Sequence, residues 1–221
     1  MIDPKTLQFL TDLAANNHKE WFHENRDRYD LAKENFLNFS SEVLKGLQQF
    51  QPNLLNTDAK KCILRINRDI RFSKDKSPYK NYLGVGWGPG GKSSGLADYY
   101  LQLEPGKSFL GGGMWAPSAT NLAKWRQEID YNPGALKGII EDKTFAATFP
   151  NRQGEQLKTS PKGYAADHPE IDLLRYKELF FFKNYSDKEV CGPDFTHQVV
   201  QDCKVLKPYL DYVNELFFGE G

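Results

Sequence analysis

The sequence predicts an α+β domain, in which a central and mostly antiparallel sheet is flanked by long N- and C-terminal helices. Apolar residues recur at helical spacing in residues 19–50 and 195–217, near the two ends of the 221-residue chain. Between them lie short aromatic and aliphatic runs separated by Gly and Pro, which is the pattern of strands. No repeat or linker divides the chain, so we predict a single domain over residues 1–221.

The N-terminal part of the chain carries two helix signals. Asp3 followed by Pro4 is typical of a helix cap and its first turn. A longer helix is predicted over residues 19–50, where apolar positions are separated by intervals of three, four and seven residues. These positions are Phe22, Tyr29, Ala32, Phe36, Phe39, Val43, Leu47 and Phe50. We expect this continuous stripe to be buried.

The C-terminal segment repeats the helical pattern. Apolar residues from Phe195 to Phe217 follow one another at intervals of three or four. Pro208 lacks the amide donor that would bond the carbonyl of Lys204, so we expect a kink or a break there. Two shorter helices are expected upstream, around residues 122–129 and 132–140.

Four short segments between the helices are predicted to be strands. They are CILRI (62–66), YYLQLEP (99–105), SFLGGGMW (108–115) and ELFFFKNY (178–185). Each is rich in β-branched, aliphatic or aromatic residues and is short enough for a strand of ordinary length.

Composition and charge exclude several classes of protein. Lys and Arg number 29 and Asp and Glu number 29, so no overall positive charge attracts nucleic acid or an anionic membrane. Three scattered cysteines are too few for a disulfide framework, and no spacing suggests a metal site. The N-terminus lacks a secretion signal, and no window of about 18 residues is apolar throughout. We expect a cytoplasmic, soluble protein that needs no metal and no cofactor.

Residues 86–93, GWGPGGKS, match the phosphate-loop pattern G-x-x-x-x-G-K-[ST] at every fixed position. A phosphate loop requires a helix that begins at the Lys-Ser pair, because that helix directs its amides and dipole at the phosphate. Gly95 lies where this helix would begin, and the residues from Tyr99 onward alternate as in a strand. We therefore expect a hairpin or loop between two strands.

The most unusual chemistry lies in residues 65–80, RINRDIRFSKDKSPYK. The cations of this segment are Arg65, Arg68, Arg71, Lys74, Lys76 and Lys80. Two anions, Asp69 and Asp75, accompany the six cations, so the segment has a net charge of +4. At ~7 Å and an effective dielectric of about 20, each unpaired contact between like charges costs about 2 kcal/mol before screening. We expect other groups to neutralise this cluster.

The backbone of this segment has two possible conformations. If a strand continues through residues 64–72, Arg68 lies in the middle of the apolar face, and a buried guanidinium needs a carboxylate, carbonyls or a bound anion. A bulge or turn at residues 67–69 would instead lift Arg68 out of that face and make it available to a ligand.

The side chains also allow two interpretations. In the structural interpretation, the arginines form salt bridges with Glu20, Glu24 or Asp27 of the long helix. In the functional interpretation, the segment is an anion pocket in which arginines bind phosphate or carboxylate, hydroxyl groups donate hydrogen bonds and lysines tune the charge. The residues of that pocket are Arg65, Arg68, Arg71, Ser73, Lys76, Tyr79 and Lys80.

Two residues further along the chain are candidates for the same pocket. Lys162 either adds a cation or is a solvated loop lysine. His168 precedes Pro169, where it either caps a short helix or helps to bind an anion at the helix N-terminus. No catalytic residue is identifiable, because no serine lies in G-x-S-x-G and no cysteine has an obvious histidine neighbour.

Six motifs give the chain a family resemblance. NNHKEWF, NRDIRFSKDKSPYK, YYLQLEPG, GGGMWAP, SPKG and DHPEIDLL occur in this order. In these motifs the chain resembles the bacterial and fungal family called domain of unknown function 2461, over about residues 6–210. The resemblance implies a shared fold and brings no established activity. It places the family's motif positions on Trp21, Phe22, Arg65, Arg68, Asp69, Arg71, Phe72, Ser73, Asp75, Lys76, Pro78, Tyr79, Lys80, Glu104, Pro161, Lys162, His168 and Pro169.

We predict that the protein binds a small anionic or phosphorylated ligand at residues 65–80, and we leave open whether it also transforms that ligand. One alternative is a nucleic-acid binding module in which Tyr79, Tyr82 and Trp87 stack on bases, although a pI of 6.9 argues against it. The other is a structural or interaction protein without a ligand site. The sequence leaves the enzyme class and the oligomeric state open.

Overall fold

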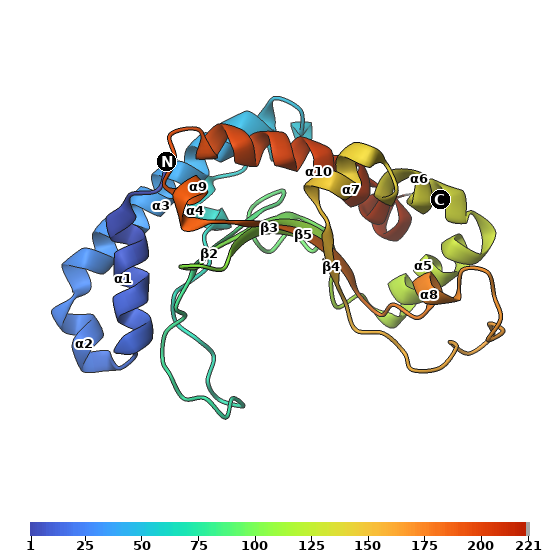
Figure 1. Cartoon of the computed structure of the whole chain (residues 1–221), viewed down its shortest axis with the longest axis horizontal. Coiled ribbons are helices and arrows are strands. Elements are labelled where there is room, and N and C mark those ends of the chain that lie inside the picture. Colours follow the sequence, from blue (N-terminus) through green and yellow to red (C-terminus); the bar gives the residue numbers. More distant parts are fainter. Residues whose placement is uncertain (220–221) are drawn as a thin grey trace. The chain divides into compact units, whose positions relative to one another are not determined.

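The computed structural model describes residues 1–219 and combines helices with a five-stranded sheet (Figure 1). The strand order is β1-β2-β3-β5-β4 and the strands are antiparallel, so the predicted α+β class is confirmed. The strands are β1 (Leu83–Trp87), β2 (Tyr99–Leu103), β3 (Ser108–Met114), β4 (Asn151–Gln153) and β5 (Leu179–Tyr185).

Helices precede the sheet, follow β3 and end the chain. Before β1 lie α1 (Pro4–Ala15), α2 (Lys19–Glu24), α3 (Arg26–Gln48), the 3-10 helix η1 (Pro52–Leu54) and α4 (Ala59–Cys62). After β3 lie α5 (Ala119–Tyr131), α6 (Pro133–Ile140), α7 (Lys143–Thr148), α8 (Ile171–Leu174), α9 (Asp187–Val190) and α10 (Phe195–Phe218). The two shorter helices expected around residues 122–129 and 132–140 are α5 and α6, so both are confirmed.

The described residues form two compact units. The first contains Met1–Ser94, Tyr100–Leu110 and Asn184–Gln201, and the second contains Gly95–Tyr99, Gly111–Lys183 and the chain from residue 202 onward. The chain passes from one unit to the other in the loop after Ser94 and then inside β2, β3, β5 and α10. The single domain over residues 1–221 stays a prediction, and residues 220 and 221 lie outside the described part of the chain.

The first helix begins where the cap signal predicts. The Asp3 side chain accepts a hydrogen bond from the Lys5 amide at 2.8 Å, and Pro4 is the first helical residue. Leu10 and Leu13 are fully buried on one face of α1, as the apolar spacing requires.

The prediction of one uninterrupted helix over residues 19–50 is wrong, because α2 ends and α3 begins at Asn25. The side-chain amide of Asn25 donates to the Trp21 carbonyl at 2.9 Å, and the side-chain oxygen of Asn25 accepts from Arg28 at 3.1 Å. Such bonds between a side chain and a nearby backbone group compete with the helical pattern. The apolar stripe survives the interruption, since Phe36 and Val43 are fully buried.

The C-terminal helix does not break at Pro208, which lies inside α10. A proline in a helix interior costs about 3 kcal/mol. Leu206, Tyr209 and Leu210 flank it and are at most 2% exposed, and burial of each such side chain contributes about 2 kcal/mol. Packing of the adjacent turns therefore outweighs the lost hydrogen bond.

Three of the four predicted strands are confirmed, as β2, β3 and β5. CILRI is not a strand, because Asp58 caps α4 by accepting from the Lys60 amide at 2.9 Å, and that helix includes Cys62. The residues after Cys62 make only isolated bridges, from Ile63 to Val85 and from Asn67 to Tyr79.

The first unit packs α3 against one face of its strands. Trp87 of β1 donates to the Ser40 hydroxyl of α3 at 3.1 Å, and Phe39 stacks on Phe195 with ring centroids 5.2 Å apart. Along β2 the burial alternates, so Leu101 is buried whereas Tyr100 is only half-buried. The second side of β2 therefore carries half-buried polar side chains, and one of them, Gln102, shares the carboxylate of Glu104 with Asn81 of the candidate site.

The second unit has its own aromatic core. Phe181 of β5 packs edge-to-face on Phe145 and on Tyr209, with ring centroids 5.1 and 5.0 Å away. The Tyr209 hydroxyl donates to the Leu179 carbonyl at 2.7 Å. Gly111 of β3 lets the strands approach, since a Cβ there would lie 2.4 Å from the Phe181 carbonyl oxygen.

Candidate functional site

Residues 63–85 form an irregular hairpin beside β2 (Figure 1). The Lys80 amide donates to the Ile66 carbonyl and the Leu64 amide donates to the Gly84 carbonyl, both at 2.8 Å. Between these two pairs, residues 81–83 lie opposite the single residue Arg65, which is a bulge of two extra residues. Bulges of this kind change the direction of nearby side chains. We call the bulge and its neighbours the base of the hairpin, and residues 69–77 its tip.

The hairpin is fixed to the corner between α1 and α2 through Tyr79. The Asn17 side chain accepts from the Tyr79 amide at 3.1 Å and donates to the Tyr79 carbonyl at 2.9 Å, in place of a neighbouring strand. The Tyr79 ring stacks on Phe22 with centroids 4.0 Å apart. Because Tyr79 is only 7% exposed, this contact is a packed anchor and not a surface contact.

Arg68 braces the tip. Its Nη1 donates to Asp75 at 2.5 Å and to the Ser77 carbonyl at 3.1 Å, and its Nη2 donates to the Ser73 hydroxyl at 3.4 Å. The strand predicted through residues 64–72 is not formed, because backbone pairing ends where the Arg68 amide donates to the Pro78 carbonyl. Arg68 therefore lies at the start of a loop whose two ends it joins.

Arg71 is also paired within the tip. It donates through Nε and Nη2 to the two carboxylate oxygens of Asp69, at 3.0 and 2.7 Å, and these bonds lower the pKa of Asp69. Lys76 donates to the Ile70 carbonyl at 2.9 Å. The predicted salt bridges to the long helix are wrong, because partners close in sequence take their place. Among residues 1–219, no ion pair joins the segment to Glu20, Glu24 or Asp27.

The base of the hairpin brings three cations together. Lys80 donates to the Arg65 carbonyl at 2.9 Å, and Lys92 donates to the Ile63 carbonyl at 2.8 Å. Burial lowers the pKa of Lys80, and the charges of Arg65 and Lys92 lower it further. In the described part of the chain, none of these three cations forms an ion pair. We call Arg65, Lys80 and Lys92 the base cations.

A cavity of about 620 Å³ lies between the two arms of the hairpin and the end of α1. Its two carboxylates already accept hydrogen bonds on both oxygens, Asp69 from Arg71 and Asp75 from Ser77 and Arg68. The Ser77 side chain and amide, followed by Arg68, lower the pKa of Asp75 to about 2. The cavity is lined by Ala14, Asn17, Arg68, Asp69, Asp75, Ser77, Tyr79, Lys80, Asn81 and Tyr82.

Glu104, at the end of β2, orients one cavity-lining group. It accepts from the Asn81 amide at 3.1 Å and from the Gln102 amide at 2.7 Å. This fixes the orientation of Asn81, so its side-chain oxygen is presented as an acceptor. Tyr82 completes the wall, with its ring centroid 5.6 Å from the Lys80 Nζ, and burial followed by the Glu104 charge raises the Tyr82 pKa.

The segment GWGPGGKS is a loop between β1 and β2, as predicted. Gly91 has a φ of 113°, and a Cβ there would lie 2.7 Å from the Lys61 carbonyl oxygen. The Lys92 amide donates to that same carbonyl at 3.2 Å. The glycine turn therefore folds Lys92 back onto residues 61–63, which sequence reasoning missed. The tight glycine turn just before Lys92 was the available signal.

Two of the three stacking platforms proposed for nucleic acid are wrong. Tyr79 is 7% exposed and Trp87 is 1% exposed, so neither ring can receive a base. Tyr82 is half-buried and lines the cavity. The exposed ring of the segment is instead Phe72 at the tip, which is 95% exposed and lies 5.8 Å from the Arg71 guanidinium.

Lys162 and His168 belong to the second unit, so the candidate site in the first unit is described without them. His168 accepts on Nδ1 from the Glu170 amide at 3.0 Å, and its Nε2 lies 3.0 Å from an Asp130 carboxylate oxygen. Both ring nitrogens are therefore engaged. The predicted capping role is wrong, because α8 begins at Ile171 and not at Pro169, and its N-cap residue is Glu170, which makes no side-chain cap hydrogen bond. Lys162 is exposed.

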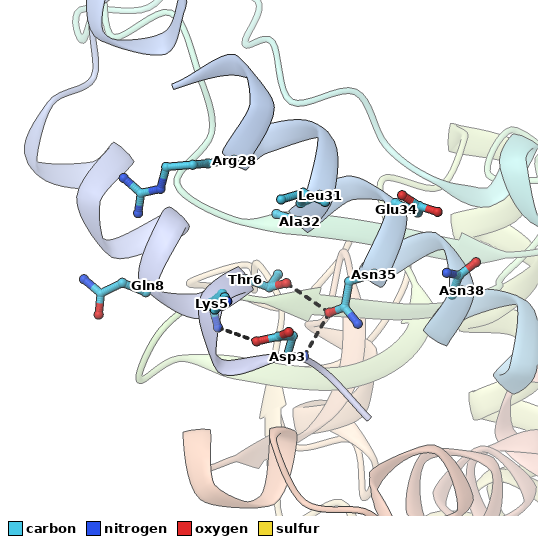
Figure 2. Close-up of a pocket in the computed structure, with 10 residues that line it drawn as sticks. All are labelled: Asp3, Lys5, Thr6, Gln8, Arg28, Leu31, Ala32, Glu34, Asn35 and Asn38. Atoms are coloured by element: carbon cyan, nitrogen blue, oxygen red, sulfur yellow. Dashed lines mark hydrogen bonds between the residues drawn. The ribbon is translucent and has the colours of Figure 1, made fainter. Parts of the chain in front are cut away.

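A second cavity of the first unit, of about 470 Å³, lies between α1 and α3 (Figure 2). Figure 2 shows the Asn35 side chain accepting from the Thr6 hydroxyl and the Asp3 amide, both at 2.9 Å. Arg28 on its wall is paired with Asp12. These polar groups satisfy one another, so this cavity is a weaker candidate for a ligand site.

Within residues 1–219, no helix is long and apolar enough to cross a membrane. No group of three or more His, Cys, Asp or Glu side chains there could hold a metal ion. The three cysteines form no disulfide within this range.

The fold and the hairpin define an α+β protein whose charged loop is anchored at the corner between α1 and α2. The chain belongs to the family described as conserved hypothetical protein (DUF2461), whose model matches residues 5–212, and the predicted resemblance is confirmed. Neither the curated proteins nor the solved structures compared with the chain gave a match.

Proposed function

We propose that the protein binds a small ligand carrying a phosphate or carboxylate group at the base of the hairpin. The observation that supports this is the meeting of three base cations without an ionic partner among the described residues, beside a cavity that Lys80 lines. A bound anion would offset the repulsion that lowers the Lys80 pKa. The guanidinium of Arg65 offers a planar pair of donors for phosphate or carboxylate oxygens.

A purely structural interpretation accounts for the tip and not for the base. At the tip, Arg68 and Arg71 each have a carboxylate partner. At the base, Lys80 and Lys92 donate to backbone carbonyls, which a neutral donor could do equally well. The charges of Lys80 and Lys92 have no carboxylate partner among the described residues, so we propose that the anion binds at the base cations and not at Arg68 and Arg71.

The remaining walls suit the uncharged part of a small ligand. The volume of about 620 Å³ falls within the roughly 300–1,000 Å³ of small-molecule sites. Asn81 offers an oriented amide and Ser77 a hydroxyl, and both line the cavity. We therefore propose a metabolite-sized anion as ligand and not a polymer.

The test is a thermal-shift and calorimetry screen with inorganic phosphate, pyruvate, sugar phosphates and nucleotides. At least one of these anions should raise the melting temperature of the unmodified protein. The double variant R65M/K92M should bind it at least ~10-fold more weakly, equivalent to about 1.4 kcal/mol. R71M is the matched control, because Arg71 is an exposed cation of the same hairpin with its own carboxylate partner.

Two outcomes would count against this function. One is the absence of binding by every anion in the screen, and the other is equal binding by R65M/K92M and the unmodified protein. Single-stranded and duplex DNA belong in the same screen, because salt-dependent DNA binding without binding of small anions would favour the nucleic-acid alternative.

We also propose a cytoplasmic location. Three cysteines without a disulfide among residues 1–219 are compatible with a reducing compartment. Cell fractionation with an antibody to the chain tests this, and recovery outside the cytoplasmic fraction would contradict it.

A further inference from the structure

Lys80 has the surroundings that make a lysine amine nucleophilic. Its side chain is half-buried on the wall of the cavity, and its Nζ donates to the Arg65 carbonyl at 2.9 Å. The charges of Arg65 and Lys92 act on it, and it forms no ion pair with a carboxylate of the described residues. A carboxylate partner would hold the proton on the amine, whereas adjacent cations favour the neutral, reactive form.

We propose that Lys80 forms an imine with a ligand that carries both an anionic group and a carbonyl group, such as a 2-oxo acid or a phosphorylated aldehyde or ketone. This inference rests on the proposed function, because Arg65 and Lys92 would hold the anionic group while Lys80 reaches the carbonyl. All three base cations then have a role, since two of them bind the anionic group and the third reacts with the carbonyl group.

The reaction consumes one amine and one carbonyl and releases one water molecule. The lone pair of the neutral Lys80 Nζ attacks the carbonyl carbon, a C–N bond forms as the C=O π bond opens, and one proton passes from the nitrogen to the carbonyl oxygen. The hydroxyl group then takes a second proton from the solvent, the C–O bond breaks to release water, and the nitrogen lone pair forms the C=N bond. The product is a protonated imine, and no oxidant or reductant is required.

The wall around Lys80 is compatible with this step. The pKa of Tyr82 is raised, so its phenol stays protonated at neutral pH and brings no negative charge to the amine. The two carboxylates of the cavity are already bonded to Arg71, Ser77 and Arg68. The charged and titratable groups to be considered around the amine are Arg65, Arg68, Asp69, Asp75, Tyr82, Lys92 and, behind Asn81, Glu104.

Lys76 is the matched comparison within the same hairpin. Its Nζ also donates to a backbone carbonyl, that of Ile70, at 2.9 Å. Its side chain is exposed, and it belongs to the tip and not to the base. Any reactivity that follows simply from being a lysine in this segment should therefore be equal at Lys80 and Lys76.

The experiment is reductive trapping on the full-length chain. The protein is incubated at pH 8 with pyruvate or with dihydroxyacetone phosphate and sodium cyanoborohydride, which delivers hydride to the imine carbon. Peptide mass spectrometry should show Lys80 modified at least ~10-fold faster than Lys76, with pyruvate adding the mass of pyruvic acid less one oxygen atom. K80R should lose this fast incorporation, and K76R should retain it. The two probes separate carboxylate-bearing from phosphate-bearing ligands.

A second measurement does not depend on the ligand or on any variant. Competitive acetylation of the unmodified protein across pH 7 to 11 should show Lys80 reaching half of its maximal rate at a lower pH than a free lysine side chain. Equal modification of Lys80 and Lys76 by both probes, or an unshifted acetylation profile for Lys80, would overturn the inference. Anion binding that depends on Arg65 and Lys92 but leaves no adduct on Lys80 would overturn the imine alone and leave the proposed function standing.

Discussion

The tip and the base of the hairpin use the same kinds of side chain with opposite results. At the tip, Arg68 and Arg71 find carboxylates seven and two residues away in the sequence. At the base, the lysine amines find only backbone carbonyls, and the cations oppose one another. A cation can acquire a partner locally, whereas an excess of positive charge is created where distant segments of the chain meet.

The comparison also shows where the local charge of +4 resides. Pairing of Arg68 and Arg71 with Asp75 and Asp69 leaves four cations of the segment without a carboxylate. Three of them, Arg65, Lys74 and Lys76, are exposed, whereas Lys80 is half-buried. Arg65 and Lys80 lie at the base, where Lys92 from the loop after β1 joins them, so the excess charge at the base includes a residue outside the segment.

Removing the anchor that tip and base share should have the largest effect. Tyr79→Ala deletes a ring that is 7% exposed and stacked on Phe22, and it should destabilise the first unit by about 3 kcal/mol. Urea unfolding measures this loss. Phe72→Ala is the control from the same hairpin, because its ring is 95% exposed and its loss should cost less than ~0.5 kcal/mol. Equal losses in both variants would show that Tyr79 does not anchor the hairpin.

The second-largest effect is expected from replacing one arginine of each region, because stability and anion binding should respond differently at the tip and at the base. Arg68→Met removes the donor to the Ser77 carbonyl and should cost about 1 kcal/mol while leaving anion binding intact. Arg65→Met removes a repulsive charge and should leave stability unchanged or slightly higher while weakening anion binding. Paired unfolding and binding measurements on the two variants test this. Loss of anion binding in Arg68→Met alone would reverse the assignment of the site.

The pH dependence of stability should differ between the unmodified protein and Lys80→Met. Because folding lowers the Lys80 pKa, the unfolded chain binds more protons than the folded one between the two pKa values. The contribution of Lys80 to the free energy of unfolding of the protein should therefore increase as the pH rises from 7 toward ~10.4. Subtracting the profile of Lys80→Met isolates this slope, and a difference that falls with pH would contradict the lowered pKa.

The smallest effect is expected at low pH, where Asp75 of the tip becomes protonated. Asp75 has a pKa of about 2, below its usual value of 3.8, so its stabilising contribution is present above pH ~4 and is lost as the pH falls toward 2. A side-chain carboxyl titration by NMR should show this value in the unmodified protein. Arg68→Met should move it part of the way back, because the hydrogen bonds from Ser77 remain.

Regular elements could be predicted from the sequence, since their causes are local. The cap at Asp3 and the apolar stripe of α3 follow from spacing alone, and β2 follows from alternation. The break at Asn25 was missed because a polar residue on the exposed face of a helix gives no signal when its side chain bonds to the backbone. CILRI has the composition of a strand, whereas the cap at Asp58, which the sequence analysis did not consider, starts a helix that includes Cys62.

The candidate site could be predicted only in part. Its position in residues 65–80 follows from charge density, and Tyr79 and Lys80 were identified. The pairing of Arg68 with Asp75 depends on how the tip turns, and the arrival of Lys92 depends on the fold of a glycine loop. Neither can be read from a count of charges, because both require knowledge of which segments are neighbours in space.

The bulge at the base has a consequence for how the chain can vary in length. Side chains alternate with a period of two along a strand, so a pair of extra residues leaves the inward and outward sides of β1 unchanged. A shorter chain lacking Asn81 and Tyr82 could keep Val85 and Trp87 in the core. A change of one residue would instead exchange the side of β1 that carries Leu83, Val85 and Trp87 with the side that carries Gly84 and Gly86. The length of the bulge can thus change in steps of two residues without rebuilding the strand that follows it.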